Sequence, residues 1–271
     1  GSNFAFNTDG FTLGGTGGGT ANQSGESFVS WNWKLNGGTT SSNTDGTITS
    51  TVQASTDAGF SIILYTGTGA NGTIGHGLGK VPAFYVVKSR SASATNWRVY
   101  HHKVATDPET DYLNLDSTIG VNDLASNWND TAPTTTTISL GTASDVNGSG
   151  ATFVAYAFAE IEGYSKFGSY TGNSSSNGTF IYTGFKPAWI MVKKITGSDD
   201  WIIHDSARST FNAVNGLLEA NTGDAEFSDN SCDFVSNGFK WRLNSGARNS
   251  SGQTYIYLAF AEQPFKFSNA R

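Results

Sequence analysis

The chain has 271 residues, of which 37% are hydrophobic, 13% aromatic and only 14% charged, and its formal net charge is -6. Scattered Lys and Arg with this negative balance argue against a nucleic-acid groove. The sequence has no apolar run of about 18 residues, which argues against a membrane-spanning helix. Its one cysteine, Cys232, allows no internal disulfide and no cysteine-based zinc site. Abundant Gly, Thr, Ser and aromatic residues predict an all-β protein with many turns.

Residues 1–56 are predicted to form an N-terminal segment of their own. Residues 11–25 are rich in glycine and offer little to bury, and the run at 14–20 lacks the Lys and the following helix of a phosphate-binding loop. The aromatic stretch at 27–34 is predicted to be a strand, and Asp45-Gly46 predicts a hairpin turn. We expect this segment to be the tail of a preceding module that packs on the unit after it.

An internal repeat divides the rest of the chain. The segment 82–88 (PAFYVVK) returns 105 positions later as 187–193 (PAWIMVK). Three further segments return in the same order, namely 60–67 as 164–172, 96–101 as 200–205, and 152–160 as 254–262. Short aromatic or β-branched runs between turn residues are typical of a small β-sandwich. The sequence therefore predicts two tandem β-sandwich repeats of jelly-roll or lectin-like kind, at 57–163 and 164–271, after the N-terminal strand segment.

Two local predictions concern single elements within the repeats. The large residues at 153–158 do not alternate cleanly, which predicts a central strand covered on both faces. Residues 211–220 are predicted to form a short helix of one or two turns.

The repeated segments carry a family resemblance. The relevant stretches are 75–82 (GHGLGKVP), 128–133 (WNDTAP), 163–172 (GYSKFGSYTG) and 257–266 (YLAFAEQPFK). They resemble an uncharacterised β-domain that recurs in tail fibre and appendage proteins of marine phages, often beside concanavalin A-like lectin domains. The similarity covers nearly all of 28–271. It implies a location on the virion surface and an adhesive or structural role, and it assigns no functional residue.

Aromatic residues without a counterpart in the other repeat are the leading candidates for ligand contact. Trp128 lies in a polar stretch with Asn129 and Asp130, and Trp241 is followed by Arg242. Exposed aromatic rings beside amide, carboxylate and guanidinium groups are typical of sugar-binding faces. Burial under a loop, or in a subunit interface, is the alternative for either tryptophan.

Calcium is the one cofactor that the residues suggest. Asp145 and Asn147 place oxygen atoms at alternate positions before Gly148, which suits a hard cation. The stretch lacks the distal bidentate Glu of a calcium loop, and its counterpart at 248–252 has no acidic residue. A hairpin turn stabilised by Asp or Asn side chains is the alternative.

The sequence favours a protein that is not an enzyme. A nucleophilic Ser or Cys needs a nearby, oriented His, whereas the adjacent His101 and His102 would point to opposite faces of a strand. Glu160 and Glu262 occupy equivalent repeat positions, which indicates structural pairing with a nearby Lys.

We therefore expect a non-enzymatic virion module that binds host cell-surface glycan through loop aromatics. The alternative is a structural spacer or assembly module that contacts other virion proteins. A symmetric homo-oligomer is compatible with both, and multivalent display would raise the avidity of weak single sites.

Overall fold

The computed structural model describes residues 3–8, 10–14, 21–35 and 38–263. Its contacts divide the chain into two units, Gly1–Lys34 and Leu35–Arg271. The glycine-rich residues 15–20 lie outside the described residues. The same holds for residues 264–266, which belong to one of the segments that carry the family resemblance.

The N-terminal unit contains a single described hairpin. Strands β1 (Asn3–Phe6) and β2 (Phe11–Gly14) pair antiparallel. The strand predicted at 27–34 is wrong, because these residues join no sheet. Val29, Trp31 and Trp33 are half-buried and alternate with exposed residues, which is the period of a strand, although the segment is not part of a sheet.

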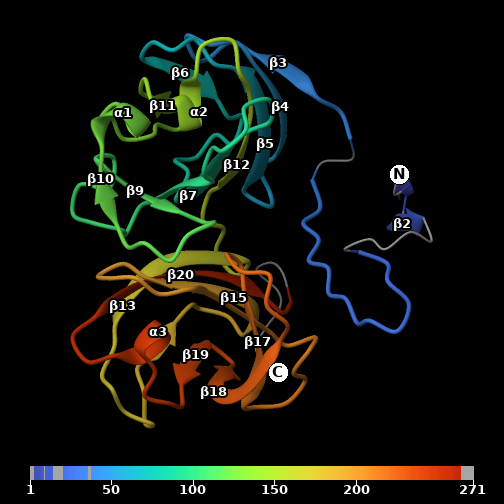
Figure 1. The fold of residues 1–271 in the computed structure, drawn as a ribbon, viewed down its shortest axis with the longest axis vertical. Coiled ribbons are helices and arrows are strands. Elements are labelled where there is room, and N and C mark those ends of the chain that lie inside the picture. Colours follow the sequence, from blue (N-terminus) through green and yellow to red (C-terminus); the bar gives the residue numbers. More distant parts are fainter. Residues whose placement is uncertain (1–2, 9, 15–20, 36–37, 264–271) are drawn as a thin grey trace. The chain divides into compact units, whose positions relative to one another are not determined.

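The second unit has two lobes, which we define as residues 38–163 and 164–263 (Figure 1). The first lobe contains β3 (Ser41–Asn43), β4 (Ser50–Ser55), β5 (Phe60–Thr66), β6 (Gly72–Gly75), β7 (Phe84–Ser89), β8 (Arg98–His101), β9 (Asp111–Asn114), β10 (Asn122–Asp123), α1 (Ala125–Trp128), β11 (Thr137–Leu140), α2 (Ser144–Asn147) and β12 (Thr152–Phe158). Its eight-stranded sheet has the order β10-β9-β8-β7-β12-β5-β4-β3, and β6 pairs with β11. The hairpin predicted at Asp45-Gly46 is present, since β3 pairs antiparallel with β4.

The second lobe repeats part of this arrangement. It contains β13 (Ser165–Thr171), β14 (Phe180–Tyr182), β15 (Pro187–Lys194), β16 (Trp201–Asp205), β17 (Val214–Glu219), β18 (Phe227–Val235), β19 (Gly238–Trp241), α3 (Gly246–Asn249) and β20 (Thr254–Ala261). The sheet order is β13-β20-β15-β16-β17-β18-β19-β14, so its first five strands follow the same path as β5-β12-β7-β8-β9. The helix predicted at 211–220 is wrong. Residues 214–219 form β17 instead, because pairing with both β16 and β18 overrides a weak local helix preference.

Each lobe is a sandwich whose core lies between its sheet layers. The predicted all-β fold class is therefore confirmed. In the first lobe, Tyr85 and Phe153 of the large sheet belong to the same core as Ile74 and Ile138 of the β6–β11 pair. In the second lobe, residues of β15 and β20 share a core with residues of β14, β18 and β19. Strand β12 lies between β5 and β7, as its unbroken hydrophobic pattern predicts.

An aromatic cluster joins the two lobes. The rings of Phe84 and Phe167 stack with centroids 6.1 Å apart, and Phe158 meets Phe260 edge-on at 5.7 Å. Phe84 and Phe158 come from the first lobe, whereas Phe167 and Phe260 come from strands β13 and β20 at the near side of the second (Figure 1). Burial of these large rings attaches the two lobes to each other.

Side-chain hydrogen bonds reinforce this boundary. Trp201 Nε1 donates to the Asn114 carbonyl at 2.8 Å, and the buried Lys193 Nζ donates to the Thr118 carbonyl at 2.7 Å. Both donors belong to the second lobe and both acceptors to the first. Because a buried donor without an acceptor is costly, these bonds fix the register of the two lobes.

The two adjacent histidines lie at the same boundary. The prediction that they point to opposite faces is wrong, because β8 ends at His101 and His102 already belongs to the following turn. The Nε2 atoms of His101 and His102 approach the Tyr257 and Phe167 carbonyls at 3.2 and 2.9 Å. His101 Nδ1 accepts the Lys103 backbone N–H at 3.0 Å, which fixes the neutral form with hydrogen on Nε2.

We expect acid to destabilise this boundary. Burial is the main cause that lowers the pKa of His101 to about 3, with repulsion from His102 and Lys103 adding to it. In the unfolded chain the pKa returns to about 6.5. Between these two pH values the unfolded chain binds more protons than the folded chain, so acid favours unfolding. The contribution of neutral His101 to the free energy of unfolding is therefore complete above about pH 6.5 and is lost as the pH falls toward 3.

The measurement is the thermal unfolding temperature at about pH 7 and about pH 4. His101→Gln keeps a donor for the Tyr257 carbonyl but cannot titrate, so the variant should lose less of its unfolding temperature on acidification than the natural chain. Equal losses in both proteins would contradict the assignment.

Candidate functional site

Trp128 lies in the core of the first lobe. It is the last residue of the short helix α1 and is 0% exposed. Its indole Nε1 donates to the Asp111 carbonyl at 3.0 Å, and its ring lies edge-on to Tyr85 with centroids 4.9 Å apart. The ring therefore offers no surface to a ligand in this structure.

Asn129 and Asp130 follow Trp128 but lie on the surface. Both are exposed and adopt left-handed backbone conformations, with φ of 56° and 42°. Asn and Asp tolerate this region better than other residues with a Cβ. Asn129 Oδ1 accepts a hydrogen bond from Asn71 Nδ2 at 2.6 Å. The structure thus divides this predicted trio between core and surface.

Trp241 and Arg242 are divided in the same way by strand alternation. Trp241 is 0% exposed and packs edge-on against Phe239 with centroids 5.7 Å apart. Arg242 points outward and forms an ion pair with Asp233 of β18 through its Nε and an Nη atom. Successive residues of an extended chain face opposite sides, so the two side chains do not share one surface.

Residues in or next to β14, β18 and β19 share an outward surface, and the sequence singled out only Arg242 among them. We call it the β14–β19 face and define it as Phe180, Tyr182, Lys240, Arg242 and Asp233. Along β14, Phe180 and Tyr182 are 45% and 65% exposed, while Ile181 between them is 5% exposed. Phe180 and Asp233 both lie opposite Lys240 in register. Cross-strand partners point to the same side, so these side chains share one surface.

Glycines let the two aromatic rings lie against the backbone. A Cβ on Gly238, opposite Tyr182, would lie 3.0 Å from Phe180 Cε2 and only 2.0 Å from the Ile181 carbonyl oxygen. A Cβ on Gly184 would lie 3.7 Å from the Tyr182 hydroxyl. A side chain at Gly238 would crowd the Phe180 ring, whereas one at Gly184 would only touch the Tyr182 hydroxyl.

The charges on this face do not cancel. Lys240 Nζ donates to Asn177 Oδ1 at 2.6 Å, which is a neutral acceptor. Among the ion pairs of the described residues, the carboxylate of Asp233 goes to Arg242 and none goes to Lys240. One positive charge therefore remains beside Phe180.

The first lobe lacks an equivalent surface. The matching strand of the first lobe, β6, carries no aromatic residue. The outer edge of β6 is also covered, because Ile48 forms a backbone bridge with Ile74. Beside this bridge, the N–H of Thr47 donates to the Thr73 hydroxyl and the N–H of Thr73 donates to the Thr47 hydroxyl. Within the described ranges, β14 pairs with β19 alone. An open edge strand with large aromatic side chains invites unwanted pairing unless it serves as a contact surface.

Sequence reasoning missed Phe180 and Tyr182, although a signal existed. Both repeats contain an Asn-Gly-Thr triplet, at 71–73 and 177–179, and only the second is followed by an aromatic–aliphatic–aromatic run. Phe180 and Tyr182 are thus aromatic residues with no equivalent in the other repeat. Because side chains alternate along a strand, the sequence also predicts that the two lie on the same face.

The predicted calcium residue Asp145 is held by a cation. Its Oδ2 atom lies 2.5 Å from an Nη atom of Arg98, and both side chains are 12% exposed. A carboxylate in such a charge-assisted pair is a poor ligand for a further cation unless the pair breaks. Among the residues that the structure describes, no group of three or more His, Cys, Asp or Glu side chains is placed to hold a metal ion.

Asn147 braces two loops of the first lobe. The residue is 0% exposed, its Oδ1 accepts the Thr68 N–H at 2.9 Å, and its Nδ2 donates to the Ala70 and Gly141 carbonyls at 2.7 and 2.8 Å. Asn249 repeats this pattern in the second lobe, with the Asn173 N–H and the Ser175 and Leu243 carbonyls as partners. The recurrence shows that this position is structural.

A buried Ser–His contact is the nearest approach to a catalytic arrangement in the described part of the chain. Ser231 Oγ lies 3.2 Å from His204 Nε2, and His204 Nδ1 lies 3.0 Å from the Gly216 carbonyl. Both residues are 0% exposed, and burial is the main cause that lowers the pKa of His204 to about 4. Substrate has no access to this pair.

The repeated acidic residues are structural partners, since Glu160 pairs with Lys166 and Glu262 with Lys186.

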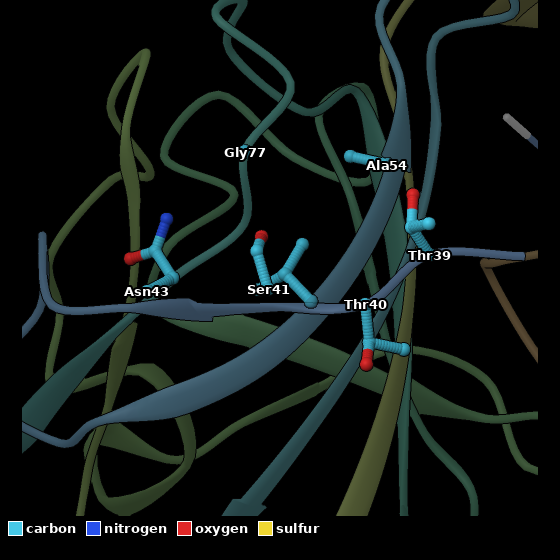
Figure 2. A pocket seen from close by; sticks show the side chains of 7 residues that line it. Thr39, Thr40, Ser41, Asn43, Ala54 and Gly77 are labelled. Atoms are coloured by element: carbon cyan, nitrogen blue, oxygen red, sulfur yellow. The ribbon is translucent and has the colours of Figure 1, made fainter.

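Two hollows are lined by residues that do not belong to the β14–β19 face. One, of about 370 Å³, lies beside β3 and is lined by Thr39, Thr40, Ser41, Asn43, Val52, Ala54 and Gly77. Figure 2 shows Ser41 and Asn43 on the same side of β3 as Gly77, with Thr40 on the opposite side. This hollow offers hydroxyl and amide groups but no aromatic ring. The other hollow belongs to the N-terminal unit, is about 480 Å³ and mostly apolar, and includes Phe6, Phe11 and Phe28.

The paired asparagines give a stability test. Asn147→Ala and Asn249→Ala each leave buried backbone groups without partners, so each should lower the free energy of unfolding by about 2–4 kcal/mol in denaturant titrations. Calcium should leave the unfolding temperature of the natural chain unchanged, because Arg98 holds Asp145. A calcium-dependent stabilisation that Asp145→Asn removes would contradict this account.

Comparison with known proteins places the chain in a family without assigning it a function. The family model described as a domain of unknown function, DUF7483, matches residues 2–264. No curated protein and no solved structure matched the chain. No helix in the described ranges is long and apolar enough to cross a membrane. The chain belongs to the DUF7483 family.

Proposed function

We propose that the chain is a non-catalytic carbohydrate-binding module of a phage tail fibre or similar virion appendage, and that the β14–β19 face contacts glycan on the host surface. The observation that carries this proposal is the exposed aromatic pair Phe180 and Tyr182 on an edge strand. Two residues apart on a strand, their backbones are about 6.6 Å apart. A short oligosaccharide can therefore cover both rings.

Polar groups around the rings suit sugar hydroxyls. Lys240 and Arg242 donate hydrogen bonds, whereas Asn177 and Asp233 accept them, and Arg242 and Asn177 are exposed. Binding sites for small ligands commonly combine an apolar platform with a few fixed polar groups. The virion setting rests on the sequence resemblance, and the DUF7483 match adds no function to it.

The proposal moves the contact from the loop aromatics to a strand face. Of the residues proposed from the sequence, Arg242 belongs to this face and Trp241 supports it from the core. Trp128 has no such place, because its ring is enclosed in the other lobe. Asn129 and Asp130 remain exposed but do not belong to the β14–β19 face.

The alternative is a structural spacer that contacts other virion proteins. It is favoured by the boundary between the lobes, where an aromatic cluster and buried hydrogen bonds join them. In that case the open edge of β14 would receive a protein strand. This alternative predicts association with protein and no affinity for sugar.

Tyr182→Ala and Phe180→Ala should each weaken glycan binding about two- to tenfold, because an aromatic contact contributes on the order of 0.5–1.5 kcal/mol. The measurement is a glycan panel probed with the chain clustered on beads, followed by titration of the best ligand. Phe211→Ala is the matched control, since Phe211 is 84% exposed and lies outside the β14–β19 face.

Circular dichroism should show that all three variants fold, because each removes an exposed side chain. Equal affinity of Tyr182→Ala, Phe180→Ala and the natural chain would contradict the assignment of the face. No binding by the clustered natural chain, together with self-association through β14, would favour the structural alternative.

A further inference from the structure

We infer that the β14–β19 face selects an acidic saccharide, meaning a sugar that carries a carboxylate or a sulfate, and this inference rests on the proposed function. The observation behind it is the uncompensated positive charge of Lys240 beside the aromatic pair. A sugar ring over Phe180 would bring its substituents within reach of this amine.

The position of the amine is fixed by Asn177. Its Oδ1 accepts one hydrogen bond from Lys240 Nζ at 2.6 Å. An ammonium group has three N–H donors, so further donors remain for a ligand. A charged donor bonds more strongly to an anionic oxygen than to a hydroxyl. An acidic substituent therefore gains more here than a neutral one.

Arg242 keeps this charge available. Asp233 lies directly opposite Lys240 in register and would be its natural partner on the same face. Two nitrogen atoms of Arg242 engage Asp233 Oδ2 instead. The Arg242–Asp233 pair therefore removes the one carboxylate on this face that would neutralise Lys240.

The net charge of the whole chain does not itself favour acidic ligands. The formal net charge is -6, so the overall field disfavours anions. Preference for an acidic sugar must then come from the local group, and a single substitution should remove it. It should also weaken at high salt, because an exposed ion pair is screened.

The experiment uses matched ligands and the full chain. Affinities are measured for a uronic-acid oligosaccharide and its carboxyl-reduced counterpart, and for a sulfated oligosaccharide and its desulfated counterpart. At low salt the natural chain should bind at least one acidic member about fivefold more tightly than its neutral match, the size expected for one exposed ion pair. The two acidic ligands distinguish a carboxylate from a sulfate.

Three variants separate the roles of the residues. Lys240→Gln should abolish the preference, because it weakens binding of the acidic sugar more than binding of its neutral match, and Lys240→Arg should retain the preference. Arg242→Gln should reduce it, since Asp233 becomes free to pair with Lys240. Tyr182→Ala should weaken binding of acidic and neutral sugars alike.

Failure of the acidic-sugar inference can be distinguished from failure of the glycan-binding proposal. Equal affinity of the natural chain for both members of each pair, or a preference that persists in Lys240→Gln, would overturn the inference and leave the glycan-binding proposal standing. No binding of any of the four oligosaccharides by the clustered natural chain would overturn both.

Discussion

The alternation of side chains along an extended strand governs both the core and the surface of the second lobe. On β19, Trp241 enters the core while Lys240 faces outward, as does Arg242 directly after the strand. On β14, Ile181 enters the same core while Phe180 and Tyr182 face outward. Because the period is two, a shift of register by one residue would exchange core and surface on both strands. Packing of Trp241 and Ile181 therefore fixes the orientation of the proposed binding residues.

The boundary between the lobes complements this arrangement by closing the other edge of the same sheet. Strand β13 ends the sheet opposite β14, and its Phe167 N–H donates to Glu160 Oε1 at 3.0 Å while the Phe167 carbonyl accepts from His102 at 2.9 Å. Residues of the first lobe thus cap an edge that would otherwise invite strand addition. In the first lobe the hairpin β3–β4 has the corresponding role beside β5. Of the edges described for the second lobe, that of β14 is the one left for contact.

The fold class could be predicted from composition and from the repeat, because glycine, threonine and aromatic residues in short runs are characteristic of sheets. The helix predicted at 211–220 could not be corrected locally, since β17 depends on distant partners in β16 and β18. Trp128 and Trp241 carried the right signal of aromatics without counterparts, but sequence alone does not show which side of an element faces solvent. Only the pairing of β14 with β19 shows which side of β19 faces the core, and so shows that Trp241 is buried while Lys240 lies on the surface side.

The most direct test of this account is an NMR titration that reports aromatic rings and indole N–H groups separately while the chain binds its best oligosaccharide. The account predicts shifts in the ring resonances of Phe180 and Tyr182, with the indole N–H signals of Trp128 and Trp241 unchanged because both rings are fully buried. Shifts confined to the indole signals, or saturable binding that leaves Phe180 and Tyr182 unchanged, would contradict it.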